Sequence, residues 1–293
     1  MSTETPQVVQ DFQHVGVVGA GLMGSGVAEV CALAGIPTIV VEANAAAAEA
    51  GLARIRKSLG RGVNAGKRTE EEAAEAEALI SVVADVASLA DCDLIVEAIV
   101  ENEKAKVAVF KQLDEVVTSP AAVLASNTSS IPIMKLAMAT GRPENVVGIH
   151  FFNPVPVLPL VELVTSLHTS KATKARAEHF AAKQLDKRVI VSQDRAGFIV
   201  NALLIPYLLS AIRMYESGFA SKEDIDDGMV AGCAHPMGPL RLTDLIGLDT
   251  TMAVAESLYA EFKEQLYAPP PLLARMVEAG LLGRKNGRGF YTY

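Results

Sequence analysis

Short apolar runs alternate with longer amphipathic stretches along the first two-thirds of the chain. The apolar runs predict strands at residues 14–18, 38–41, 93–100, 122–125, 146–149, 160–164 and 188–191. Helical patterns lie between these runs, at residues 22–34, 45–62, 70–80, 103–117 and 171–185. Strands that are buried on both faces and alternate with helices indicate an α/β fold with a doubly wound, mostly parallel sheet.

The pattern changes after Gln193, where the alternation of strands and helices ends. From Phe198 onward the segments are helical and no strand is predicted. The chain has 293 residues, and at roughly 150 residues per domain this length suggests two domains. We therefore predict an α/β domain over residues 1–193 and an all-helical domain over residues 194–293.

Composition and charge exclude several functional classes. Half of the chain is apolar (50%) and 20% is charged, which is typical of a folded globular protein. The net charge of −8 argues against nucleic acid as a partner, because that needs a broad basic face. The best candidate for a membrane span is the uncharged stretch at residues 196–212, but it includes Asn201 and Pro206 and falls short of the ~20 apolar residues that cross a bilayer. It predicts a buried helix and no membrane association.

The cysteines and the N-terminus bear on the compartment. Cys31, Cys92 and Cys233 are odd in number and widely spaced, so they predict neither a disulfide framework nor a zinc site. Free thiols fit a reducing compartment. Residues 1–7 show no basic region followed by an apolar run, so we expect no signal peptide. A cytoplasmic protein is the resulting prediction.

A glycine-rich turn follows the first predicted strand and opens a helix. Its first glycine allows the tight turn, its second leaves room for a pyrophosphate, and its third lets helix and strand pack closely. Glu42 ends the second strand, where a carboxylate binds ribose hydroxyls and repels a 2′-phosphate. The glycine pattern alone does not separate NAD from FAD. The predicted dinucleotide-binding residues of the turn are Gly19, Ala20, Gly21, Leu22, Met23 and Gly24.

Two further segments carry side chains suited to acid–base chemistry. Residues 127–130 (Asn-Thr-Ser-Ser) follow a strand, where ligands bind in doubly wound sheets, although they also suit an ordinary helix cap. His150 ends the next strand, and Glu162 lies on the one after it. If the chain returns past His150, the carboxylate can bond one imidazole nitrogen and orient the other toward a substrate proton. A satisfied core histidine is the alternative. The other histidines have no metal-ligand spacing, so no metal is predicted: His14, His168, His179 and His235.

Four motifs together resemble those of the L-3-hydroxyacyl-CoA dehydrogenases, and among these the bacterial 3-hydroxybutyryl-CoA dehydrogenases most. The motifs are Asn-Thr-Ser-Ser at 127–130, His-Phe-Phe-Asn-Pro-Val-Pro at 150–156, Gly-Phe-Ile-Val-Asn at 197–201 and Pro-Met-Gly-Pro at 236–239. The resemblance implies a Rossmann-type NAD-binding domain followed by a helical domain that forms a homodimer and contributes to the substrate site. It also implies NAD-dependent oxidation of (S)-3-hydroxyacyl-CoA, such as 3-hydroxybutyryl-CoA, and the reverse reduction of acetoacetyl-CoA, in fatty-acid and butanoate metabolism.

The resemblance also assigns residue roles. It makes His150 the general base and Glu162 its orienting partner. Ser129 corresponds to a residue that contacts the substrate oxygen and the nicotinamide, and Asn201 to one that reaches in from the second domain. The remaining positions that match cofactor contacts are Glu101, Lys106, Asn153 and Lys285.

A basic cluster between residues 51 and 69 contains no acid and stands out in an acidic chain. Arginine and lysine suit the 3′-phosphate and pyrophosphate of coenzyme A, although a solvated helix face explains the cluster as well. The resemblance favours the first reading, because the family binds CoA with a helix pair here, and it adds Ser58 and Lys67 as substrate contacts. The basic residues are Arg54, Arg56, Lys57, Arg61, Lys67 and Arg68.

Two rival functions share parts of this pattern. A related NAD-dependent dehydrogenase of sugar acids, such as L-gulonate, would have the same turn and a histidine–glutamate pair, but the basic cluster argues against it. A dinucleotide-binding protein without catalysis would have no need to combine Ser129, His150, Glu162 and Asn201.

Overall fold

An eight-stranded sheet forms the centre of the first part of the chain, in the order β3-β2-β1-β4-β5-β6-β7-β8. The computed structural model describes residues 9–293, so the expected lack of a signal peptide concerns residues outside that range. Every neighbouring pair of strands is parallel except β6 and β7. This confirms the predicted doubly wound, mostly parallel sheet. The strands are β1 (Val15–Val18), β2 (Thr38–Val41), β3 (Ile80–Val83), β4 (Leu94–Glu97), β5 (Val123–Ser126), β6 (Val146–Phe151), β7 (Leu160–Thr165) and β8 (Arg188–Gln193).

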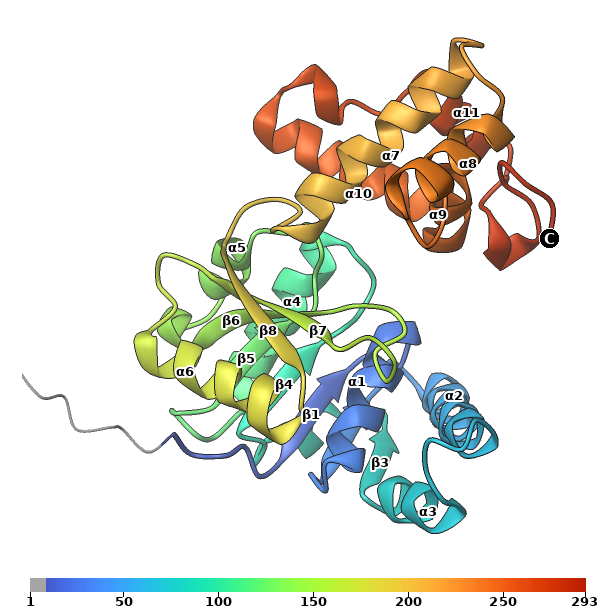
Figure 1. Ribbon diagram of the computed structural model, residues 1–293. Helices are drawn as coiled ribbons and strands as arrows, with labels where there is room; N and C mark the ends of the chain where they lie inside the picture. Colours follow the sequence, from blue (N-terminus) through green and yellow to red (C-terminus); the bar gives the residue numbers. More distant parts are fainter. Residues whose placement is uncertain (1–8) are drawn as a thin grey trace, which may run out of the picture. The chain divides into compact units, whose positions relative to one another are not determined.

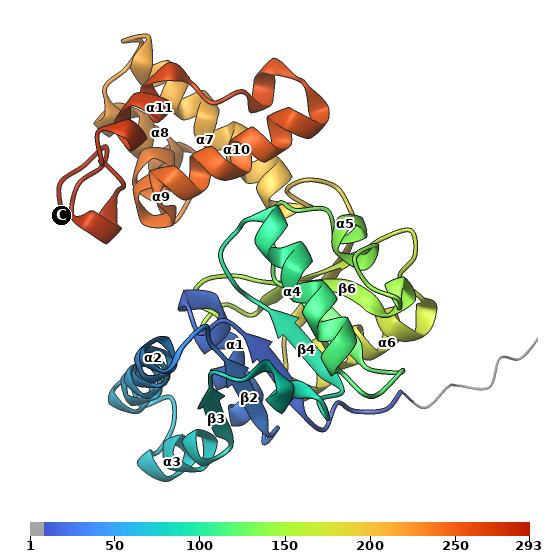
Figure 2. The ribbon, with the colours of Figure 1, turned by 180° about the vertical axis from the view of Figure 1, so that it is seen from behind.

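Helices cover both faces of this sheet. Figure 1 shows α1 and α6 on one face, and Figure 2, seen from behind, shows α4 on the other. The core between α1, α6 and the sheet is apolar, from Val27 on α1 to Ala177 on α6. The helices are α1 (Leu22–Leu33), α2 (Ala45–Asn64), α3 (Glu70–Ala78), α4 (Glu103–Val116), α5 (Ile133–Ala137) and α6 (Lys171–His179), with a π-helical turn η3 (Phe180–Gln184) and 3₁₀ turns η1 (Val86–Leu89) and η2 (Pro143–Asn145).

One predicted helix is too long. The pattern predicted a helix over residues 70–80, but α3 ends at Ala78 and the chain then enters the edge strand β3. A capping box between Thr69 and Glu72 starts α3. The β-branched residues that end β3 favour a strand, and pairing with β2 supplies the hydrogen bonds that decide it.

The chain divides into two compact units, one ending at Asp194 and the other spanning Arg195–Tyr293. The second unit is all helical, as predicted, and Ser221 caps α8 by accepting the N–H of Asp224. No helix among residues 9–293 is long and apolar enough to cross a membrane. The helices of this unit are α7 (Val200–Glu216), α8 (Lys222–Cys233), α9 (Pro239–Ile246), α10 (Leu248–Phe262) and α11 (Pro271–Glu278), with 3₁₀ turns η4 (Gln265–Tyr267) and η5 (Arg284–Asn286).

Two buried carboxylates connect the elements of the second unit, and neither was predicted from the sequence. Asp226 on α8 accepts the N–H of Leu240 at 2.8 Å and so caps α9. Asp244 on α9 accepts the N–H groups of Phe290 and Tyr291, each at 2.9 Å. Each carboxylate replaces water with backbone donors, which is how a buried charge is stabilised in an apolar core.

Candidate active site

The glycine-rich turn between β1 and α1 is shaped for a pyrophosphate. A Cβ at Gly24 would lie 1.8 Å from the carbonyl oxygen of Gly19, so this contact requires glycine. A Cβ at Gly21 would meet nothing within 4 Å, so the turn faces open space there. No side chain caps the N-terminus of α1. Backbone N–H groups at such a helix end bind phosphate oxygens, so the turn fits the pyrophosphate of a dinucleotide.

Glu42 lies directly after β2 and holds the same turn. Its Oε1 accepts the N–H of Ala20 at 2.5 Å, and its Oε2 accepts the N–H of Ala43 at 3.1 Å. The side chain is half-buried beside the glycine-rich turn. A carboxylate fixed at the end of the second strand can accept the ribose hydroxyls of adenosine, and its charge opposes a 2′-phosphate. These residues fit NAD.

The carboxyl ends of β4, β5 and β6 meet at one edge of the sheet. Glu97, the last residue of β4, is in register with Ser126, the last residue of β5. The Asn127 side chain connects β5 to β6, because its Oδ1 accepts the N–H of Phe151 at 2.8 Å. The structure thus brings residues 127–130 to the same edge as His150, where doubly wound sheets bind ligands.

His150 and Glu162 face each other across the one antiparallel strand pair of the sheet. They are register partners on β6 and β7, and Nδ1 of His150 lies 2.8 Å from Oε2 of Glu162. Their side chains are 7% and 0% exposed. The ring of Phe152 lies 4.6 Å from the imidazole, centroid to centroid. A carboxylate on Nδ1 sets the tautomer and orientation of the ring, so Nε2 is the nitrogen suited to exchange a substrate proton.

Glu101, in the loop between β4 and α4, binds the segment that carries Ser129. Its Oε1 accepts the N–H groups of Ser129 and Ser130 at 2.9 and 3.1 Å and the hydroxyl of Thr128 at 2.6 Å. Burial raises the pKa of this carboxyl, but the charge of Lys106 and these hydrogen bonds outweigh burial and hold the pKa below its usual range. An ionised Glu101 therefore fixes residues 127–130, the Ser129 loop, at neutral pH.

Lys106, on α4, is buried between two carboxylates. Its side chain is 1% exposed, and Nζ lies 2.6 Å from Oε1 of Glu97 and 3.3 Å from Oε2 of Glu101. Lys106 and Glu101 are among the residues predicted from the sequence, but Glu97, which is fully buried, is not. The available signal was an acidic residue inside an otherwise apolar strand, because such a charge needs a buried partner.

Three predicted site residues lie away from these clusters or in the other unit. Asn153 is exposed in the loop after β6. Asn201 lies half-buried in the first turn of α7, within the second unit. Lys285 lies in η5 of the same unit, where its ammonium pairs with Asp249. Their roles in binding remain predictions.

The basic cluster is not one surface. Arg54 donates to the carbonyl oxygen of Ala20, within the dinucleotide turn, and its expected contact with coenzyme A remains a prediction. Arg56 forms an exposed ion pair with Glu77 at 2.7 Å. The physical reason is helical spacing: residues 54 and 56 point to different faces of α2, so shared charge does not imply a shared ligand.

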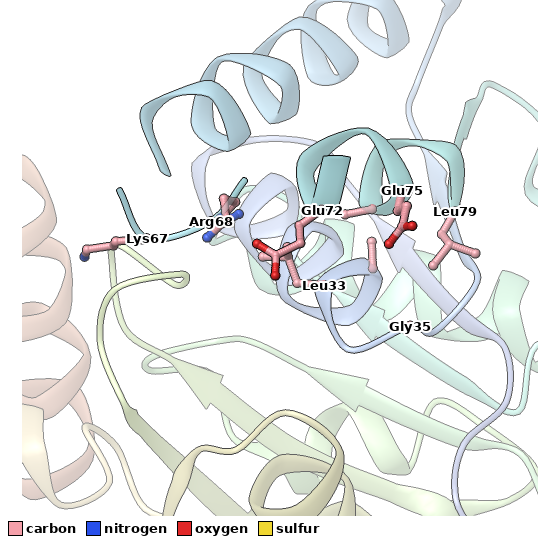
Figure 3. Close-up of a pocket in the computed structure, with 9 residues that line it drawn as sticks. Leu33, Gly35, Lys67, Arg68, Glu72, Glu75 and Leu79 are labelled. Carbon is pink, nitrogen blue, oxygen red and sulfur yellow. The ribbon is translucent and has the colours of Figure 1, made fainter. Parts of the chain in front are cut away.

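Arg68 and Lys67 lie at a pocket between the end of α1 and the start of α3. The pocket has a volume of about 340 Å³, and Figure 3 shows Lys67 and Arg68 at one end and Glu75 at the other. Arg68 pairs with the buried Glu29 on α1 at 2.9 Å, which anchors the α2–α3 turn. Both signs of charge line this pocket, so its charge alone selects no ligand. No group of three or more metal-ligating side chains occurs within residues 9–293.

Comparison with known families covers nearly the whole chain. The model of the 3-hydroxyacyl-CoA dehydrogenase NAD-binding domain matches residues 14–195, and that of the 3-hydroxyacyl-CoA dehydrogenase C-terminal domain matches residues 197–293. A 3-hydroxybutyryl-CoA dehydrogenase of Mycobacterium tuberculosis is 60% identical over 282 residues, which is 96% of this chain and 99% of that protein. One from Bradyrhizobium diazoefficiens is 46% identical over 282 residues, covering 96% of each chain.

Solved structures agree in fold over the same length. The crystal structure of M. tuberculosis FadB2 has a TM-score of 0.96 and 60% identity, covering 97% of this chain and 100% of that one. The (S)-3-hydroxybutyryl-CoA dehydrogenase PaaH1 from Ralstonia eutropha has a TM-score of 0.91 and 46% identity, covering 97% of this chain and 99% of that one.

Proposed function

The chain belongs to the 3-hydroxyacyl-CoA dehydrogenase family, and we propose that it interconverts (S)-3-hydroxybutyryl-CoA and acetoacetyl-CoA in fatty-acid and butanoate metabolism. It is an NAD-dependent oxidoreductase. The observation that carries the reaction type, oxidation of an alcohol, is the buried His150–Glu162 pair at 2.8 Å, on the sheet whose first strand leads into the glycine-rich turn. The choice of an acyl-CoA substrate rests on the family match. An alcohol can lose hydride only if its hydroxyl proton is removed, and this pair is built to move that proton.

In the proposed mechanism His150 takes the hydroxyl proton on Nε2 during oxidation and returns it during reduction. NAD, when bound, accepts or supplies the hydride. Glu162 keeps the imidazole in one orientation and stabilises the imidazolium as it forms, because a carboxylate beside a cation favours the charged form. Ser129, held by Glu101, orients the substrate oxygen. No residue of the chain has to form a covalent bond to the substrate.

The acyl-CoA contacts follow from the family and remain proposals. We assign Ser58 on α2 and Lys67 to the CoA portion, and Asn201 to the acyl end. Ser58 is half-buried and Lys67 is exposed. Lys67 supplies a positive charge at the α2–α3 turn, where it would meet a phosphate group of CoA as a point donor, whereas Arg68 is paired with Glu29. The remaining cofactor contacts that we propose are Glu101, Lys106, Asn153 and Lys285.

We also propose a homodimer formed through the second unit, in the cytoplasm. Large apolar side chains are exposed on this unit: Leu203 is 72% exposed, Phe219 79% and Met214 41%. The proposal rests on the family resemblance, and these exposed side chains are apolar surface that an interface would bury. The three thiols are free, which fits a reducing compartment. Light scattering after gel filtration tests the dimer, and a monomer at micromolar concentration contradicts it.

The decisive experiment is reduction of acetoacetyl-CoA with NADH, followed by loss of the nicotinamide absorbance. We expect turnover that requires both compounds. L-gulonate with NAD serves as the matched test of the sugar-acid alternative, and we expect no turnover with it. NADH binding without reduction of either substrate would instead support a dinucleotide-binding protein that lacks catalysis.

A further inference from the structure

Glu97 is a fully buried acid near the predicted active site, and no role has been assigned to it above. It ends β4, its side chain is 0% exposed, and three groups surround its carboxylate. Lys106 Nζ lies 2.6 Å from Oε1, and the N–H of Ile99 donates to the same oxygen at 2.7 Å. The hydroxyl of Ser126 donates to Oε2 at 2.6 Å.

The first oxygen of Glu97 leads to the Ser129 loop through a chain of charges. Oε1 holds the ammonium of Lys106, which lies 3.3 Å from Oε2 of Glu101. The other oxygen of Glu101 accepts the N–H groups of Ser129 and Ser130. Lys106 is 1% exposed, so its position is set by these carboxylates and not by solvent.

The second oxygen of Glu97 leads to the same loop by a shorter route. Oε2 accepts the Ser126 hydroxyl at 2.6 Å, and the Ser126 oxygen in turn accepts the N–H of Thr128 at 3.1 Å. Ser126 is the last residue of β5, directly before the loop. Both oxygens of the buried Glu97 carboxylate are therefore connected to residues 128–130 through hydrogen bonds and ion pairs.

We propose that Glu97 is a positioning residue that fixes the Ser129 loop through two arms, Lys106–Glu101 and Ser126. This inference rests on the proposed function for the role of Ser129, but the positioning itself does not. Buried networks of this kind are rigid when every member is satisfied and lose rigidity when one member is removed. Glu97 touches neither substrate nor cofactor in this scheme. Glu97 also sets the positions of Lys106 and Glu101, which we propose as cofactor contacts.

Hydrogen exchange tests the positioning without relying on catalysis. In Glu97→Gln the peptide covering residues 127–131 should exchange its amides about tenfold faster, because the donors of Ser129 and Ser130 lose their fixed acceptor. Ser126→Ala and Lys106→Met each cut one arm and should give smaller increases. Unchanged exchange in a folded Glu97→Gln protein overturns the proposal.

A matched control separates this effect from general loss of stability. Asp114, which lies on α4 like Lys106, accepts the Nε–H of Arg142 at 2.7 Å and the N–H of Gly141 at 2.6 Å. Asp114→Asn weakens another ion pair of the same helix and should leave exchange at residues 127–131 unchanged. Equal acceleration in both variants would overturn the proposal. If Glu97→Gln does not fold, the double variant Glu97→Gln/Lys106→Met is used instead, because it leaves no lysine charge buried beside the neutral side chain. Its amide exchange at residues 127–131 is then compared with that of the wild type.

A mutant cycle with Ser129 tests the consequence for the reaction. Glu97→Gln should lower kcat for acetoacetyl-CoA reduction about tenfold in the wild-type background. The loss should be less than threefold in a Ser129→Ala background, because the hydroxyl that Glu97 positions is then already missing. An equal fold-loss in both backgrounds indicates a merely structural role and overturns the proposal. A wild-type enzyme without this activity contradicts the proposed function alone, since the exchange experiment still decides the positioning.

Discussion

Arg54 donates a hydrogen bond to the carbonyl oxygen of Ala20, the residue between the first two glycines of the dinucleotide turn. The contact exists because α2 packs directly on the turn: a Cβ at Gly51, one helical turn before Arg54, would lie 2.4 Å from the Cβ of Ala20. Arg54 therefore brings a positive charge to the loop that we expect to bind the pyrophosphate, although its sequence neighbours suggested a role with coenzyme A.

Replacing Arg54 by alanine should raise KM for NADH and leave KM for acetoacetyl-CoA nearly unchanged. Hydrogen bonds from charged groups contribute about 1.5–3 kcal/mol, and exposure of this side chain reduces the effect to a rise of about threefold to tenfold. Steady-state kinetics with each substrate varied in turn measures both constants. Arg56→Ala is the control, because Arg56 pairs with the half-buried Glu77 on α3. A rise confined to KM for acetoacetyl-CoA in Arg54→Ala would contradict this prediction and indicate that Arg54 contacts coenzyme A.

Glu42 should make the enzyme strongly prefer NADH to NADPH. Its carboxylate is fixed by the N–H groups of Ala20 and Ala43, so it cannot turn away from a 2′-phosphate. Like charges in contact cost up to several kcal/mol, and we expect kcat/KM to be lower with NADPH by about tenfold or more. Glu42→Gln keeps the shape of the side chain without its charge and should bring kcat/KM with NADPH closer to kcat/KM with NADH. Equal kcat/KM for the two cofactors in the wild type would contradict this prediction.

Much of the fold and part of the site could be predicted from the sequence. Strand periodicity and the glycine-rich turn are local signals, so the sheet and the turn followed from them. The edge strand β3 was missed, because the β-branched residues of Ile80–Val83 are a weak signal directly after a helix and pairing with β2 decides the strand. Arg54 and Glu97 could not be placed either. Their roles depend on which distant residue faces them, Ala20 or Lys106, and a single sequence carries no such information.

The pH dependence of stability should report Glu101. Its folded pKa lies below its ordinary value of 4.5, so its contribution is present above about pH 4.5 and is lost as the pH falls through the folded pKa. The side chain is 33% exposed, so screening limits the contribution to about 1 kcal/mol. The free energies of urea unfolding of the wild type and Glu101→Gln should differ at pH 7 and converge as the pH is lowered below 4.5. A gap between the two proteins that widens on acidification would contradict the sign.

Thiol reactivity should single out Cys233. Cys31 and Cys92 are buried, and burial raises their pKa to about 12 and about 11. Since only the thiolate attacks a disulfide reagent, the native protein should show one reactive thiol, and three after denaturation. Cys233→Ser is the matched variant and should remove the fast phase. Fast modification of a second thiol in native Cys233→Ser would show that one of the buried cysteines opens to solvent.

The His150–Glu162 pair should behave as one unit in catalysis. His150→Gln keeps some hydrogen bonding but cannot carry a proton at neutral pH, so kcat should fall by ~10²–10⁴ while NADH still binds. Glu162→Gln keeps the contact with Nδ1 but removes the charge that stabilises imidazolium, so it too should lower kcat. Because the side chains lie 2.8 Å apart and share one proton-transfer task, the double variant should lose less than the product of the single losses. Single-turnover reduction of acetoacetyl-CoA and NADH fluorescence titration separate chemistry from binding. Near-wild-type kcat in His150→Gln would refute the general base, whereas multiplicative losses would show that Glu162 acts independently of it.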